Sequence, residues 1–301
     1  MAKILITGGS GLVGKAISEL LLKQGHEPRW LGRESGSWHE IQKFKWDISK
    51  NYIDEKSFEG VESIVHLAGA GIIDKCWADS YKKEIIDSRV KSSQLLFETI
   101  SKNNFKIKTL IGASAVGYYG SVQSEHSYEE NDAPGKDFLA ETCSAWEKSY
   151  SPFINSGIRT VVIRTGIALS EKGGAYAKML PPFKIGLGAA IGNGKQYFPW
   201  IHIKDLAGIF IYGLLHPSLN GPYNASSSEP ISNKEFSKQL AKSLKRPFFL
   251  PNIPEFALKL VLGERAMTVT TGLKISNKKI KKEGFVFEFD DLGKALEDLS
   301  N

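Results

Sequence analysis

A short apolar run, a glycine-rich turn and an amphipathic helix follow one another at the start of the chain. Lys3–Thr7 reads Lys-Ile-Leu-Ile-Thr, which is typical of a buried parallel strand. Apolar residues then recur at helical spacing from Leu12 onward. Gly8, Gly11 and Gly14 lie in and just after the turn, three residues apart. A strand, a turn of this kind and a helix together indicate a dinucleotide-binding α/β unit.

Each glycine has a physical role in such a unit. One allows a tight turn, one lets the backbone approach a pyrophosphate, and one lets the helix pack closely on the strand. The helix N-terminus adds free N–H groups and the positive end of the helix dipole. The residues that we expect to hold a cofactor here are Thr7, Gly8, Ser10, Gly11, Leu12, Val13 and Gly14. The alternative is a glycine-rich turn without a ligand.

The residue after the second expected strand distinguishes two cofactors. His26–Gly32 reads as that strand, and Arg33 follows it. A fold of this type that prefers NAD usually has Asp or Glu here for the ribose 2′-hydroxyl, whereas an arginine suits a 2′-phosphate. Arg33 therefore favours NADP(H), unless it is an ordinary surface arginine. A third strand, Phe44–Asp47, ends in a carboxylate, and we expect Asp47 to face the adenine.

Two more strands are expected at Val61–Leu67 and Thr109–Ala113, on either side of a long helix at Ser80–Lys102. His66 lies inside the first of them and fits a core histidine better than a ligand. Small residues follow, and they allow the backbone to pass close beneath a cofactor ribose. The residues expected there are Leu67, Ala68 and Gly69.

Strands that alternate with helices at this spacing predict an α/β fold of the Rossmann type, with a doubly wound parallel sheet. A ligand should bind at the carboxyl ends of its strands. We assign residues 1–172 to an NADP-binding domain that residues 201–219 complete. A smaller C-terminal substrate lobe takes residues 173–200 and 220–301. Its glycine- and lysine-rich stretch 171–199 is expected to be a functional loop over the crevice.

Several segments carry a family likeness. They are Thr7–Gly14, His66–Gly69, Ser114–Gly120, Trp200–Ala207 and Gly221–Ala225. In this order they resemble landmarks of the extended short-chain dehydrogenases/reductases. The chain is most similar to an atypical branch, the NAD-dependent epimerase/dehydratase-like "epimerase family" (YfcH-like) proteins. That branch has a C-terminal segment of unknown function, which corresponds here to about residues 246–299.

The resemblance implies catalysis by a Ser or Thr together with a Tyr-x-x-x-Lys pair on the helix after the fifth strand. Residues four apart share a helical face, so the ammonium can lower the pKa of the phenol. In this chain Leu139 and Cys143 stand at those positions, and a shift by one residue gives Phe138 and Thr142. No Tyr-x-x-x-Lys occurs between Gly120 and Arg159. The usual acid–base pair is absent.

Other residues could take part in the chemistry. Ser114 is expected to donate a hydrogen bond to a substrate oxygen and to contact the cofactor. Tyr118 and Tyr119 are the nearest phenols that could replace the missing acid, the alternative being packing at the end of the fifth strand. Cys143 fits an inert small hydrophobe better than a nucleophile. By resemblance, Arg164 at the end of a sixth strand meets the nicotinamide end of the cofactor or the substrate.

Composition excludes several classes of protein. A net charge of +6 is modest for 301 residues, and the C-terminal lysines lack the interleaved aromatic residues of a nucleic-acid site. The two cysteines cannot form a zinc site alone and suit a reducing compartment. With no apolar leader or membrane-length run, we expect a cytoplasmic protein without membrane or nucleic-acid partners. The resemblance implies that a homodimer would pair through residues 80–102 and 138–155.

Two functions are compatible with these motifs and with the family likeness. The first is an NADP-dependent oxidoreductase or epimerase that transfers hydride on a small polar, sugar-like or carbonyl substrate. The second is a non-catalytic NADP(H)-binding redox sensor or regulatory module, which the missing Tyr-x-x-x-Lys pair favours. The composition of the substrate lobe favours the first, since a sensor has little need of a second pocket. The sequence does not identify a substrate.

Overall fold

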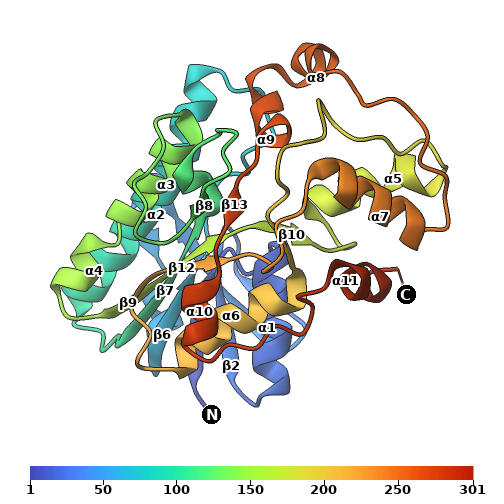
Figure 1. The fold of residues 1–301 in the computed structure, drawn as a ribbon. Helices are drawn as coiled ribbons and strands as arrows, with labels where there is room; N and C mark the ends of the chain where they lie inside the picture. The colour runs from blue at the N-terminus through green and yellow to red at the C-terminus, as the bar shows by residue number, and fades with distance from the viewer. Residues whose placement is uncertain (301) are drawn as a thin grey trace.

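A central, mostly parallel sheet organises this computed structural model, which describes residues 1–300 (Figure 1). In spatial order its strands are β12 (Gly221–Ala225), β9 (Arg159–Thr165), β7 (Thr109–Ala115), β6 (Val61–His66), β1 (Lys3–Thr7), β2 (Glu27–Gly32), β4 (Ile41–Asp47) and β3 (Gly36–Trp38). Only β3 and the short β5 (Tyr52–Ile53) are antiparallel to their partner, β4. This order confirms the predicted Rossmann-type fold.

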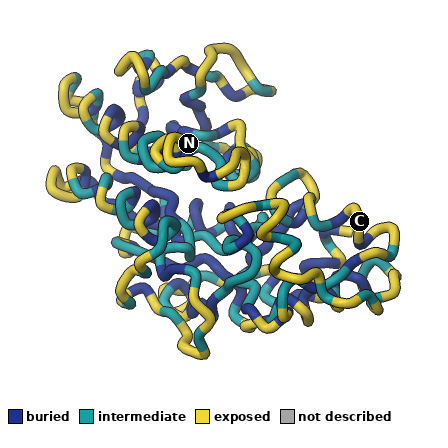
Figure 2. The backbone as a smooth tube through the Cα atoms, turned by 90° about the horizontal axis from the view of Figure 1, so that it is seen from above, coloured by how far each residue is buried: buried dark blue, intermediate teal, exposed yellow. Residues whose placement is uncertain are grey.

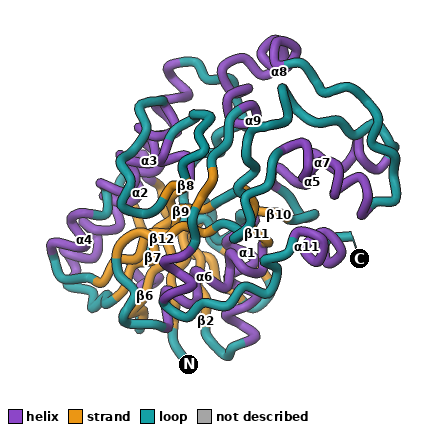
Figure 3. Tube along the Cα trace, in the orientation of Figure 1, coloured by secondary structure: helices purple, strands orange, loops and turns teal. Residues whose placement is uncertain are grey.

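The apolar runs seen in the sequence form the centre of the sheet. In β1, Leu5 and Ile6 are fully buried, and they pair with β2 on one side and β6 on the other. Helices cover both faces of the sheet, as is typical of a sheet whose central strands are all parallel. The helices are α1 (Leu12–Lys23) and α6 (Ile203–Leu215) on one face, and α2 (Asp79–Asn103), α3 (Phe138–Lys148) and α4 (Ser151–Asn155) on the other (Figure 1). In Figure 3 the strands lie at the centre with helices around them.

A second apolar cluster forms a smaller lobe beside the sheet. Its elements are β10 (Ile167–Leu169), α5 (Gly174–Lys184), β11 (Trp200–His202), α7 (Asn233–Ser243) and α11 (Leu292–Asp298). Tyr176, Trp200 and Phe236 are fully buried in this cluster. Figure 2 shows buried positions in the interior of both parts, with exposed positions on the outer turns.

The last fifty residues pass back over the whole molecule. They form α8 (Glu255–Leu262), η4 (Gly263–Ala266), α9 (Met267–Thr270), β13 (Lys274–Ile275), α10 (Lys278–Lys282) and α11. Their side chains enter four separate apolar clusters: Ile280 joins the sheet core, Leu296 the smaller lobe, Met267 a cluster around Trp77, and Leu273 a cluster around Tyr119.

Three local differences separate the structure from the sequence expectations. The expected loop 171–199 contains helix α5, which begins at Gly173 and Gly174, both with positive φ, and tolerates Pro181 and Pro182 near its end. The expected helix 138–155 is broken into α3 and α4 around Tyr150. Strand β12, placed in the substrate lobe from sequence, lies in the main sheet beside β9.

The described residues contain no membrane-length apolar segment. Across 1–300, no helix combines the length and the apolar composition needed to cross a bilayer. Over the same range, no group of three or more His, Cys, Asp or Glu side chains is arranged to hold a metal ion.

Candidate functional site

The glycine turn between β1 and α1 has the geometry of an anion-binding loop. Gly8 has a φ of 69°, and a Cβ there would lie 3.1 Å from the carbonyl carbon of Leu67. A Cβ on Gly14 would lie 2.5 Å from the Gly8 oxygen, so the close approach of helix and turn requires glycine. The N-cap residue Gly11 gives no side-chain cap. The first-turn amides of α1 therefore have no partner within the helix or from a capping side chain.

Thr7 fixes the neighbouring loop from the interior. Its side chain is fully buried, and its Oγ1 accepts hydrogen bonds from the amides of Leu67 and Ala68, both at 3.1 Å. The same oxygen lies 2.7 Å from Nδ1 of His66. Burial lowers the pKa of His66 to about 3, so this histidine is a neutral core residue. The Thr7 hydroxyl thus holds the β6 loop against the glycine turn instead of facing a ligand.

The remaining predicted cofactor residues around the turn differ in their accessibility. Ser10, Gly11 and Gly69 are exposed, whereas Leu12, Val13, Leu67 and Ala68 are half-buried. Arg33 is exposed at the carboxyl end of β2. Asp47 caps the turn η1 (Ile48–Lys50), where its carboxylate accepts hydrogen bonds from the amide and the hydroxyl of Ser49 at 3.0 and 2.6 Å. These bonds lower the pKa of Asp47, and both are accepted by the same carboxylate oxygen, Oδ1.

Ser114 and Arg164 lie side by side in paired strands and share one carboxylate. The Ser114 hydroxyl donates to Glu147 of α3 at 2.7 Å. Arg164 donates to both oxygens of the same carboxylate, through Nε and Nη2, at 2.9 Å each. Burial opposes the charge of Arg164, but Glu147 outweighs it and raises the pKa of the guanidinium. The hydroxyl hydrogen of Ser114 is thus directed to Glu147, not outward as expected from the sequence.

The two tyrosines after β7 differ in their surroundings, although both lie in η3 (Val116–Tyr119). The Tyr119 hydroxyl donates to Asn224 at 2.7 Å and accepts from Arg164 at 2.9 Å. Burial raises the pKa of Tyr119 to about 12. Tyr118 is half-buried, and the Arg164 guanidinium lies 3.5 Å from its ring centroid. Of the two phenols, Tyr118 is the one with a solvent-accessible surface.

Helix α3 presents no acid–base pair to this region. Leu139 and Cys143 face the turn after β7, where a Cβ on Gly117 would lie 3.6 Å from the Leu139 Cβ and 3.8 Å from the Cys143 Sγ. Burial raises the pKa of the Cys143 thiol to about 11. The thiol is therefore protonated at neutral pH and is a poor nucleophile.

The C-terminal segment bridges the loop that follows β6. Arg265 of η4 donates from Nη1 to the Ile73 oxygen at 3.1 Å, and Glu264 forms an ion pair with Lys82 of α2. Met267 packs against the cluster around Trp77. Beside this bridge a cavity of about 430 Å³ lies between Ser121 and the residues of α8, η4 and α9. Its lining residue Ser121 lies two residues after the turn η3 that carries Tyr118.

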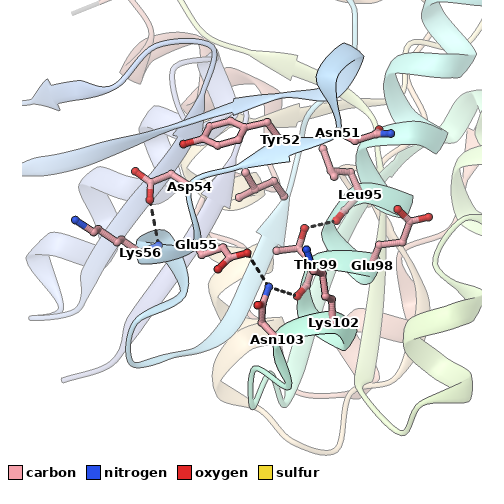
Figure 4. Close-up of a pocket in the computed structure, with 11 residues that line it drawn as sticks. Asn51, Tyr52, Asp54, Glu55, Lys56, Leu95, Glu98, Thr99, Lys102 and Asn103 are labelled. Carbon is pink, nitrogen blue, oxygen red and sulfur yellow. Dashed lines mark hydrogen bonds between the residues drawn. The ribbon is translucent and has the colours of Figure 1, made fainter.

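A larger cleft of about 660 Å³ lies elsewhere, between β5, the turn η2 (Glu55–Phe58) and the C-terminal half of α2 (Figure 4). Within it, the Asn103 amide donates to Glu55 at 3.0 Å. The turn η2 leads into the amino end of β6 and the C-terminal half of α2 leads into that of β7, whereas the glycine turn follows the carboxyl end of β1. Ligands of such sheets bind at the carboxyl ends, and we assign no chemistry to this cleft.

Comparison with known proteins agrees with this geometry. Residues 4–226 match the model of the NAD dependent epimerase/dehydratase family. The chain belongs to this family. Residues 253–299 match a domain of unknown function, DUF1731. Both findings confirm the resemblance stated from the sequence motifs.

Members of the family from distant organisms align over the full length of the chain. The epimerase family protein YfhF of Bacillus subtilis is 34% identical over 98% of this chain and 97% of its own. Human SDR39U1, also named an epimerase family protein, is 33% identical over 99% of both chains. A crystal structure of human SDR39U1 with NADPH superimposes with a TM-score of 0.87 at 30% identity, covering 99% of both chains. A Thermus thermophilus UDP-glucose 4-epimerase with NAD shares the fold, at a TM-score of 0.74 and 20% identity over 99% of this chain and 98% of that one.

The role of Glu147 was not predicted from the sequence. The residue was visible as a carboxylate one turn after Cys143 on the same helix face, and this spacing was the signal that could have been used. Its two partners come from strands β7 and β9, and their adjacency depends on strand pairing that one sequence does not display.

Proposed function

We propose that this protein binds NADP(H) along the carboxyl edge of the sheet and transfers hydride to or from a small polar substrate. The observation that carries the proposal is the uncapped glycine turn of α1 together with the exposed Arg33 at the end of β2. Free helix amides suit a pyrophosphate, and an arginine suits a 2′-phosphate. The NADPH present in the human SDR39U1 crystal structure supports the same cofactor.

Bound NADP(H) would supply or accept the hydride. Gly8–Gly14 would hold its pyrophosphate and Arg33 its 2′-phosphate, while Gly69 leaves room for the ribose. The chain's own contribution to proton transfer is assigned to Tyr118, the accessible phenol at the end of β7. Ser114, whose hydrogen is directed to Glu147, would accept a hydrogen bond from a substrate hydroxyl.

A second candidate function is a redox sensor without catalysis. Leu139 and Cys143 favour it, because neither side chain can replace a phenol or an ammonium in acid–base chemistry. The cavity of about 430 Å³ between Ser121 and the C-terminal helices favours the enzyme, because a sensor needs no substrate site.

Calorimetric titration with NADPH, NADP and NADH, with nicotinamide fluorescence in parallel, tests the proposal. We expect tight binding of NADPH and weak binding of NADH. If no dinucleotide binds, the proposed function is wrong. If NADPH binds, a screen of carbonyl and sugar substrates for oxidation of NADPH separates the enzyme from the sensor.

A further inference from the structure

Arg89 is a buried arginine without a carboxylate partner. Its residue surface is only 7% exposed, and its Nη1 donates to the backbone oxygens of Ala70 at 3.1 Å and Ile85 at 2.9 Å. Its Nε has no hydrogen-bond partner among residues 1–300, and no Asp or Glu in that range forms an ion pair with it. A buried cation without a counter-charge is costly. Packing alone therefore does not explain why a charged side chain occupies this position.

The guanidinium lies directly behind the exposed loop after β6. A Cβ on Gly69 would come within 2.9 Å of the Arg89 Cζ, so the charged group touches the backbone of this glycine. Gly69 itself is exposed. The charge of Arg89 thus lies against the backbone of an exposed residue on which we expect the proposed cofactor to rest.

Arg89 also lies next to the place where the family resemblance implies a lysine. Helix α2 packs against α3, and the Arg89 guanidinium lies 4.7 Å from the ring centroid of Trp146. Burial dominates the pKa of the Cys143 thiol, and the charge of Arg89 partly opposes that effect. Cys143 stands at the position of the missing lysine. The positive charge of Arg89 on α2 is therefore near the position on α3 where the resemblance implies a lysine.

We infer that Arg89 supplies the fixed positive charge that a lysine on α3 would supply, and that this charge acts on the reacting end of the site. The inference rests on the proposed function. A fixed cation in a site shielded from water favours states with more negative charge. It would stabilise negative charge on a substrate oxygen, and it would favour the neutral reduced nicotinamide over the positively charged oxidised ring.

The ratio of the affinities for NADPH and NADP tests this inference without a substrate. We expect the wild-type protein to bind NADPH more tightly. Arg89→Gln keeps a polar N–H group but removes the charge, and it should reduce the preference by about tenfold, as for unit charges roughly 10 Å apart in a protein site. Arg89→Lys should keep the preference. A merely structural role of Arg89 would change both affinities alike and leave their ratio unchanged.

Arg33→Gln is the matched control, because it removes a positive charge at the other end of the proposed cofactor site. It should weaken NADPH and NADP equally. A wild-type protein that binds neither dinucleotide overturns the proposed function. A protein that binds both without preference, or keeps its preference in Arg89→Gln, overturns only the role of Arg89. If Arg89→Gln does not fold, Arg89→Met, which keeps the apolar stem and removes the charge, takes its place: a reduced preference supports the inference, and a retained preference overturns it.

Discussion

Glu147 binds Arg164 through both carboxylate oxygens, at 2.9 Å each, in the interior beneath the end of β7. The side chain of Arg164 is 3% exposed and that of Glu147 is 16% exposed. The pair also positions its neighbours, because Glu147 accepts from Ser114 and Arg164 stacks on Tyr118. A single ion pair thus orients both residues that we assign to the substrate side.

Glu147→Gln should strongly destabilise the fold. The change leaves the guanidinium of Arg164 buried without a counter-charge, for which we expect a loss of about 3–5 kcal/mol in the free energy of unfolding. Denaturant unfolding measures it. Glu62→Gln is the control, because it breaks the exposed pair with Lys108 and should cost less than about 1 kcal/mol. Equal losses for the two variants would contradict the prediction.

Tyr118→Phe and Tyr119→Phe should affect different properties, turnover and stability respectively. Removing the Tyr119 hydroxyl takes one buried hydrogen bond from the Asn224 side-chain oxygen and one from the Arg164 guanidinium, so the free energy of unfolding should fall by about 1–3 kcal/mol. Tyr118→Phe should leave stability within about 0.5 kcal/mol and lower kcat once a substrate is found. Thermal unfolding and turnover assays check both. Unchanged turnover in Tyr118→Phe would refute the proton-transfer assignment.

Arg33→Ala should discriminate between cofactors. It removes the charge expected to meet a 2′-phosphate, so the affinity for NADPH should fall by about tenfold or more while that for NADH stays nearly the same. Titration of both cofactors measures the effect. Lys23→Ala removes an exposed charge from the far end of α1 and should change neither affinity. An equal loss for both cofactors in Arg33→Ala would rule out the 2′-phosphate contact.

Acidification should destabilise the fold through His66. Its pKa is about 3 when folded and 6.5 as a free side chain, so the unfolded chain takes up a proton first. The contribution of neutral His66 to the free energy of unfolding is complete above pH 6.5 and is lost as the pH falls toward 3. The loss should reach about 2 kcal/mol by pH 5. His202, whose pKa burial lowers to about 4, adds to the trend.

The histidine contribution is measured as the pH dependence of the free energy of unfolding between pH 7 and pH 5. His66→Gln should flatten the curve. His39→Asn alters an exposed histidine with a φ of 49°, which asparagine tolerates, and it should leave the slope unchanged. A wild-type slope in His66→Gln would show that other groups take up the protons.

The elements that could be predicted from the sequence are those whose signals are local. The strand, turn and helix of residues 3–23 are visible in their glycine spacing and apolar periodicity, and the helix expected at Ser80–Lys102 is α2. Helix α5 was missed because glycines and prolines at its ends outweigh the helix-favouring residues between them. Strand β12 was assigned to the wrong part because its partner, β9, lies about sixty residues earlier.

The site was predictable only in part, for a related reason. The glycine turn is contiguous in sequence, whereas the grouping of Ser114 with Glu147 and Arg164 depends on tertiary packing. Arg89 could have been noticed in the sequence, because it falls four residues after Ile85 on the buried face of α2, where an arginine is unusual. Its lack of a counter-charge, however, becomes visible only when the neighbouring strands and helices are in place.

The C-terminal segment packs into four separate apolar clusters, so it cannot be removed from the chain as an independent domain. Residues 253–299 have no interior of their own, because Ile280, Leu296, Met267 and Leu273 each enter a different cluster. A chain shortened to the part that matches the epimerase model would expose apolar surface in four places at once. Cellular chaperones and proteases recognise exposed apolar surface of this kind, so we expect the two regions of this chain to be stable only when they are made together.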